Sequence, residues 1–107
     1  MIRVKFFIGN NRLNGFEIKG HAMFDEIGKD VVCATVSSAA YMAANTVTDV
    51  IGASAQASVD KATMFLKLNE SNDKCEAVLR GLELHLTELS KQYPQNIKVI
   101  YGGVKNA

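Results

Sequence analysis

A chain of 107 residues is enough for one compact domain and leaves no room for a second. Its composition, 48% hydrophobic and 21% charged, is ordinary for a globular protein and excludes intrinsic disorder. Twelve basic and 11 acidic residues leave a net charge of +1 without forming a basic stripe, which argues against direct binding of nucleic acid.

The sequence gives no sign of export or membrane insertion. No unbroken apolar run approaches the roughly 18 residues of a membrane span. Residues 1–7 alternate polar with apolar side chains, unlike the apolar core of a signal peptide. We therefore expect a cytoplasmic protein with no membrane partner. In that reducing compartment Cys33 and Cys75, which lie far apart and in no C-x-x-C pattern, should be free thiols.

The first predicted elements are two strands that form a hairpin. Residues 2–8 alternate apolar with polar side chains, which predicts a half-buried strand, and residues 16–20 alternate again. We place turn chemistry at 9–11 and at 14–15, because Asn and Gly tolerate the positive φ that tight turns need.

A long helix is predicted next, over residues 30–51, which contain neither Gly nor Pro and repeat small or β-branched apolar residues at helical spacing. Gly52 is its expected C-terminal stop. A second helix is predicted from an N-cap at 71–73 to about Tyr93, just before the only proline. Its expected core stripe is Cys75, Val78, Leu79, Leu82, Leu86, Leu89 and Tyr93.

Three further strands complete the predicted order. They cover residues 53–59, 62–69 and 97–101, so the elements run β-β-α-β-β-α-β. We predict an α+β fold, with a sheet of about five strands covered by two long helices. The order of the strands in the sheet does not follow from the sequence.

The chemically suggestive segments are G-H-A at 20–22 and D-V-V-C at 30–33. His21 ends a predicted strand, and Cys33 is the third helical residue if Asp30 is the N-cap. A thiol at a helix N-terminus has a lowered pKa, and a nearby imidazolium lowers it further. Such a pair is what nucleophilic cysteine catalysis requires, and N–H groups at the helix start could hold an oxyanion. The plainer alternative is a solvated histidine and a buried cysteine.

The G-H-A motif, the intervening loop and the run G-x-D-V-V-C-A-x-V-S-S closely resemble the ribosomal-processing cysteine protease family, called Prp. The resemblance covers essentially the whole chain. It implies a catalytic dyad of His21 and Cys33, and a homodimer. It also implies a substrate: the N-terminal extension of a large-subunit ribosomal protein, cut just after an apolar segment that contains aromatic residues.

Asp30 matches an acidic position of that family, and two roles are open for it. Its carboxylate could orient the His21 imidazole as a third catalytic member. Alternatively, it is the N-cap of the first helix. The two roles compete, because a carboxylate that accepts the N–H of Cys33 leaves that donor unavailable to an oxyanion.

Gly20 and Gly28 bracket a short segment with three large apolar side chains, Met23, Phe24 and Ile27. One interpretation is a lid hinged near the two glycines, whose apolar side chains bind the substrate peptide. The other is an ordinary surface loop that places those side chains in the core. The family resemblance favours the lid.

The remaining candidates have simpler roles. Cys75 lies on the apolar stripe of the second helix and is expected in the core, whereas His85 lies off that stripe and is expected in solvent. His21, Cys33 and one carboxylate make fewer ligands than the four of a structural zinc site, so we expect no metal.

We therefore expect a cytoplasmic, dimeric cysteine endopeptidase without a cofactor, in which Cys33 is the nucleophile and His21 the general base and acid. The competing class is a non-enzymatic, ribosome-associated module that captures a peptide in the same groove without cutting it. Loss of cleavage with retained binding in a Cys33→Ser variant would favour the enzyme.

Overall fold

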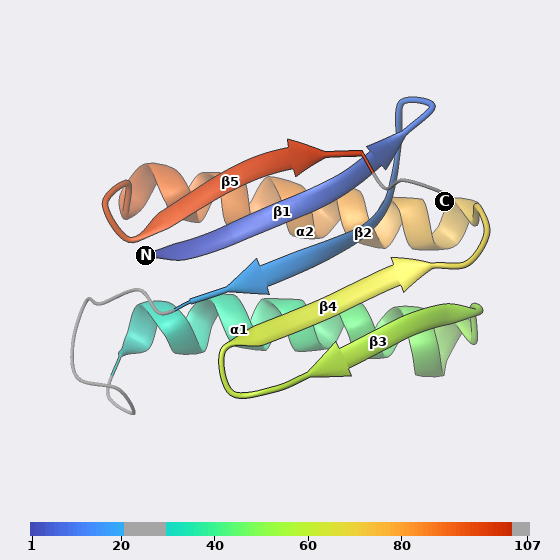
Figure 1. Cartoon of the computed structure of the whole chain (residues 1–107), viewed down its shortest axis with the longest axis horizontal. Helices are drawn as coiled ribbons and strands as arrows, with labels where there is room; N and C mark the ends of the chain where they lie inside the picture. Colours follow the sequence, from blue (N-terminus) through green and yellow to red (C-terminus); the bar gives the residue numbers. More distant parts are fainter. Residues whose placement is uncertain (21–29, 104–107) are drawn as a thin grey trace.

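The computed structural model describes residues 1–20 and 30–103. In this part of the chain five strands form one sheet, and two long helices lie together on one side of it (Figure 1). The predicted α+β class and the order β-β-α-β-β-α-β are confirmed.

The elements are, in order, β1 (Ile2–Gly9), β2 (Arg12–Lys19), α1 (Val31–Asn45), a π-helical extension η1 (Thr46–Ile51), β3 (Ala55–Val59), β4 (Thr63–Leu68), α2 (Asp73–Gln92) and β5 (Ile97–Gly102). The strand order in the sheet is β3-β4-β2-β1-β5. Within these five described strands, β1 and β5 pair in parallel, and the other neighbours pair antiparallel. The edge strands are therefore β3 and β5.

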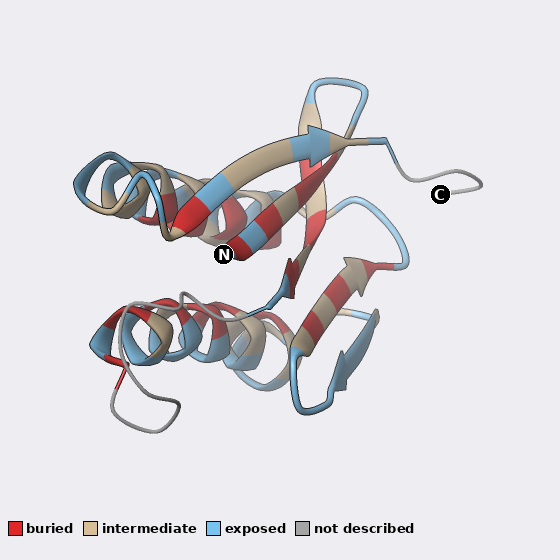
Figure 2. Ribbon diagram, turned by 60° about the vertical axis from the view of Figure 1, so that its left-hand side comes forward, coloured by how far each residue is buried: buried red, intermediate tan, exposed pale blue. Residues whose placement is uncertain are grey.

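The core lies between the sheet and the helices. Alternate side chains of β1, β2 and β4 point to the helices, and Phe6, Phe16 and Leu66 are fully buried among them. Figure 2 shows this as alternating buried and half-buried bands along β4. Burying one such side chain stabilises a fold by about 1.5–3 kcal/mol. All seven residues predicted for the stripe of α2 are buried in this core or packed against it.

The β1–β2 turn corrects one expectation. Asn10 and Asn11 make the turn, with φ of 53° and 61°, whereas Asn14 and Gly15 lie inside β2. Our placement of turn chemistry at 14–15 is therefore wrong. The glycine is needed for a different reason: a Cβ at Gly15 would lie 2.1 Å from the carbonyl oxygen of Leu66 in the neighbouring β4.

The first helix ends where predicted, at Gly52, which adopts a left-handed φ of 73°. The helical stretch Val31–Ile51 has 21 residues and is long and apolar enough, by length and composition only, to cross a membrane. The stretch is not an unbroken apolar run, because Ser, Thr, Asn and Asp residues interrupt it. Its side chains Val32, Val36 and Val47 are buried in the core, whereas Val31, Met42 and Val50 are exposed.

Candidate active site

The start of α1 is fixed by Asp30, which caps the helix. Asp30 has extended backbone (φ −77°, ψ 102°), and its Oδ1 accepts the N–H groups of Val32 at 2.9 Å and Cys33 at 3.1 Å. Its carbonyl accepts the N–H of Ala34 at 3.1 Å, which closes the first helical turn. Asp30 is thus the N-cap of α1. The other role that the sequence left open, orientation of the His21 imidazole, involves a residue outside the described part of the chain and stays a prediction.

This cap places Cys33 at the third residue of α1, with its side chain half-buried against the core. The position lies in the first turn, where the helix dipole favours negative charge. Because the N–H of Cys33 donates to Asp30, that group is not available as an oxyanion donor in this conformation.

Cys33 lines a cavity of about 170 Å³ between α1 and the turn that joins β3 to β4. Ser37 and Tyr41 follow Cys33 at intervals of four residues and line the same wall. The end of β2, with Ile18 and Gly20, forms another part of the lining. The cavity therefore offers an apolar wall and several polar groups beside one thiol.

The opposite rim is the β3–β4 turn, which Asp60 shapes. Its Oδ1 accepts the N–H groups of Ala62 at 3.1 Å and Thr63 at 3.0 Å, so the turn is closed by a side chain. Val59 and Lys61 lie on the cavity side of this turn. The rim is therefore held in place by hydrogen bonds within the turn itself.

Gly20 directly follows β2 at the edge of the cavity and has a conformation that only glycine adopts readily. Its φ is +93°, and a Cβ there would lie 2.5 Å from the carbonyl oxygen of Met1. Its N–H donates to the carbonyl of Ala62 at 3.0 Å. The chain is thus anchored to the cavity rim one residue before His21.

Five predicted site residues lie outside the described residues: His21, Met23, Phe24, Ile27 and Gly28. The pairing of His21 with Cys33 and the lid therefore stay predictions. Gly20, the other expected hinge, is described and has the positive φ of a special backbone position.

Sequence reasoning missed the remaining walls of the cavity. Ser37 and Tyr41 could have been found, because residues four and eight positions after Cys33 share its helix face. The rim at Asp60, Lys61 and Ala62 could not, since it depends on a strand order that the sequence does not reveal.

Two other expectations concern residues away from the cavity, and both are confirmed. Cys75 is fully buried, and this burial raises the pKa of its thiol. His85 is exposed on the surface of α2. The two cysteines therefore differ in surroundings: Cys75 is buried in the core, whereas Cys33 is half-buried and lines the cavity.

Comparisons with known proteins identify one family whose model matches most of the chain. The family described as cysteine protease Prp matches residues 1–98. The ribosomal processing cysteine protease Prp of Bacillus subtilis (strain 168) is 30% identical over 91 residues, which cover 78% of this chain and 81% of that protein.

Solved structures share the fold at lower sequence identity. The ribosomal processing protease Prp from S. aureus, in complex with a covalently linked product peptide, matches with a TM-score of 0.89 and 22% identity, covering 95% of this chain and all (100%) of that one. The same protease with a substrate peptide gives a TM-score of 0.83 at 21% identity, with 95% and 100% coverage. The structure of SMU.848 from Streptococcus mutans matches with a TM-score of 0.82 and 24% sequence identity. The match covers 97% of this chain and 96% of that one.

Proposed function

Because this chain belongs to the Prp family of cysteine proteases, we propose that it removes the N-terminal extension of a large-subunit ribosomal protein, with Cys33 as nucleophile and His21 as general base and acid. One observation carries the proposal. The half-buried Cys33 thiol lies in the first turn of α1 and lines a cavity large enough to receive part of a peptide.

The surroundings of Cys33 support the role of nucleophile. A helix N-terminus stabilises a thiolate, and the thiolate is the reactive form of cysteine. Gly20 lines the same cavity as Cys33, and His21 is the next residue in the sequence after Gly20. The other histidine, His85, lies on the surface of α2 and lines a different cavity.

The proposed reaction has two steps. His21 takes the thiol proton, and the Cys33 thiolate attacks the carbonyl carbon of the scissile peptide bond. The C–N bond breaks, and His21 returns the proton to the leaving amine, which leaves a thioester on Cys33. His21 then takes a proton from water, and the hydroxide attacks the thioester carbon. The C–S bond breaks, the Cys33 thiolate leaves and recovers the proton from His21, and the acid product is freed and ionises in water.

The proposed substrate is supported by the relatives and by the shape of the cavity. The Bacillus subtilis relative is a ribosomal processing protease, and the S. aureus relative binds a substrate peptide and a covalently linked product peptide. In this chain Ile2, Ile18 and Val36 give the cavity an apolar lining. Such a lining suits an apolar side chain next to the scissile bond, as the family resemblance implies.

We further propose that the enzyme works in the cytoplasm as a homodimer, as the resemblance implies. Sedimentation equilibrium measures the oligomeric state directly. A mass equal to twice 11.6 kDa supports the dimer, and a mass of 11.6 kDa at micromolar concentration contradicts it.

The test of the function is an incubation of the protein with the extended ribosomal protein, followed by intact mass measurement. We expect one truncated product with the wild-type chain and none with Cys33→Ser, which should still bind the substrate. A wild-type chain that binds the substrate and never cuts it would instead be a peptide-binding module. A Cys33→Ser variant that cuts normally would remove Cys33 from the reaction.

A further inference from the structure

The outer edge of β3 is open. In the part of the chain that the structure describes, β3 pairs with β4 alone and ends the sheet on that side. Its five residues, Ala55–Val59, are exposed apart from the half-buried Ala55, and Figure 2 shows β3 as an exposed band. Natural proteins protect such edges with charges, proline or a bulge, and the sequence A-Q-A-S-V has neither charge nor proline.

The register of β3 shows which main-chain groups face outward. Hydrogen bonds join Asn69 N–H to the Ser54 carbonyl at 3.0 Å and Asp60 N–H to the Thr63 carbonyl at 2.9 Å. In an antiparallel ladder the hydrogen-bonded pairs alternate with non-bonded pairs. Every even-numbered residue from 54 to 60 therefore bonds toward β4.

The odd-numbered residues direct their main-chain groups the other way. Ala55, Ala57 and Val59 thus offer their N–H and C=O groups to the open edge, while Gln56 and Ser58 are paired with β4. The edge presents donors and acceptors at the spacing that another extended chain matches. It is a template for a sixth strand.

Among residues 1–20 and 30–103, apolar side chains beside this edge are left exposed. Ala57 and Val59 lie in register with Leu66 and Met64, whose buried side chains point to the helices. Val59 is nevertheless 55% exposed, and Tyr41 on α1 is 44% exposed. The sheet therefore has helix-facing apolar surface at β3 that α1 leaves uncovered, and an added strand would cover it.

The edge leads directly to the candidate active site. Val59, the last residue of β3, lines the same cavity as Cys33. A chain extended along Ala55–Val59 would run about 3.3 Å per residue and end at this cavity. This continuity favours a peptide substrate as the occupant over a second copy of the chain, which would have no reason to end at the thiol.

We propose that β3 is the docking edge for the substrate, whose stretch on one side of the scissile bond pairs with Ala55, Ala57 and Val59 as a sixth strand. This inference rests on the proposed function. Main-chain pairing supplies affinity with little regard to sequence, whereas the cavity beside Cys33 selects the side chain next to the cut. The substrate is thus an extended peptide, and the enzyme recognises the side chains of the substrate only near the scissile bond.

The first test uses Ala57→Pro, which removes one outward N–H. The pairs of Gln56 and Ser58 with β4 stay intact, because proline is tolerated on an edge strand when its missing N–H faces outward. Binding is measured by fluorescence anisotropy in a Cys33→Ser background. The probes are a peptide that spans the cleaved bond of the ribosomal extension and extends along β3 on both sides, and a truncated peptide with only the residues at the cut.

We expect Ala57→Pro to raise the Kd of the long peptide on the order of five- to tenfold. An effect of this size corresponds to the loss of one hydrogen bond together with a small disturbance of the neighbouring ones. The advantage of the long over the truncated peptide should shrink by the same factor. Gln56→Ser is the matched control, since that main chain faces β4 and its side chain lies on the sheet face away from the helices. It should leave the Kd unchanged.

The second test needs no variant of the protein. Single N-methyl groups placed along the long peptide should weaken binding at every second position on one side of the scissile bond and have little effect between them. This alternation follows from strand pairing alone. Circular dichroism shows whether Ala57→Pro folds. If that variant does not fold, the N-methyl scan alone tests whether the substrate pairs with β3.

The remaining outcomes separate the two proposals. Binding of the long peptide that is indifferent to Ala57→Pro, or an N-methyl scan without alternation, overturns the docking edge and leaves the proposed function standing. Failure of the Cys33→Ser protein with an unchanged β3 to bind either peptide contradicts both proposals. If Ala57→Pro changes the sedimentation mass and not peptide binding, the edge contacts a second copy, and our proposal is wrong.

Discussion

The two helices lie on the same side of the sheet and are built in opposite ways. The 20 residues of α2 combine an apolar stripe with charged side chains on its other faces. The 15 residues of α1 contain no charged side chain at all, and the exposed residues of α1 include Val31 and Met42. The described part of α2 is therefore held by apolar packing and by ion pairs, whereas α1 is held by close packing and by the Asp30 cap at its start.

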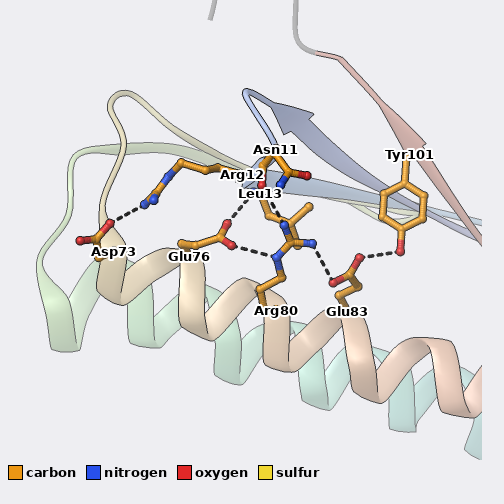
Figure 3. A network of polar contacts seen from close by, with 8 residues as sticks. All are labelled: Asn11, Arg12, Leu13, Asp73, Glu76, Arg80, Glu83 and Tyr101. Carbon is orange, nitrogen blue, oxygen red and sulfur yellow. Dashed lines mark hydrogen bonds and ion pairs between the residues drawn. The ribbon is translucent and has the colours of Figure 1, made fainter.

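Figure 3 shows the polar interactions that fix α2. Arg80 donates to Glu76 at 2.8 Å, to Glu83 at 3.2 Å and to the carbonyl of Asn11 in the β1–β2 turn at 3.1 Å. Glu83 also accepts the hydroxyl of Tyr101 in β5, which joins a third element to the network. The network fastens α2 to both the hairpin and the edge strand β5.

The comparison assigns different tasks to the two sides of the molecule. The α2 side has its core stripe and its network, and both stabilise the fold. The α1 side has the cavity, the thiol of Cys33 and the open edge of β3. Substitutions in the core stripe and the polar network of α2 should lower the free energy of unfolding and leave the cleavage rate of the folded protein unchanged. Substitutions of residues that react in the cavity should lower the cleavage rate and leave the free energy of unfolding unchanged.

The largest expected effect is that of His21→Ala. Removing a positioned general acid and base should lower kcat/KM by roughly 10²–10⁴-fold, while the free energy of unfolding stays near the wild-type value. Cleavage assays and urea denaturation on the same preparation check both halves of this statement. Near-normal cleavage would remove His21 from the mechanism.

Leu79→Ala is the opposite case, because Leu79 is fully buried on the stripe of α2. Truncation of a buried leucine should lower the free energy of unfolding by about 2–5 kcal/mol. Cleavage per folded molecule, measured well below the melting temperature, should remain close to wild type. A large loss of activity in the folded variant would mean that the two sides are coupled.

Arg80→Met tests the polar network with a smaller effect. The pKa of Arg80 is raised by its hydrogen bonds to Glu76 and Glu83, but its side chain is 38% exposed, so solvent screens the ion pairs. We expect a loss of about 1 kcal/mol in unfolding free energy that diminishes in high salt. A loss that is the same in low and high salt would point to packing of the side-chain stem instead.

The smallest effect is expected at alkaline pH. Burial raises the pKa of Cys75, and the hydrogen bond to Glu83 followed by burial raises the pKa of Tyr101. The folded protein thus keeps protons that the unfolded chain releases, so stability should fall as the pH rises above about 9. Urea titrations from pH 7 upward test this, and Cys75→Ala should remove the earliest part of the fall.

Local signals in the sequence predicted much of this molecule. The cap at Asp30, the stop at Gly52 and the stripe of α2 each depend on residues within one helix. The prediction for Gly15 is wrong because the need for glycine there depends on a residue distant in the sequence. The carbonyl of Leu66, in another strand, lies close to Gly15. The rim of the cavity near Asp60 is not predicted for the same reason, because the order of the strands in the sheet brings it close to Cys33.

The central claim is that the thiol on the α1 side reacts and the thiol on the α2 side does not. The most direct measurement is alkylation of the folded protein with iodoacetamide near neutral pH, with peptide mapping and cleavage assays on the same samples. We predict that Cys33 is labelled while Cys75 is spared, and that activity is lost in proportion to labelling of Cys33. Equal labelling of both thiols, or full activity in a protein alkylated at Cys33, would contradict the account.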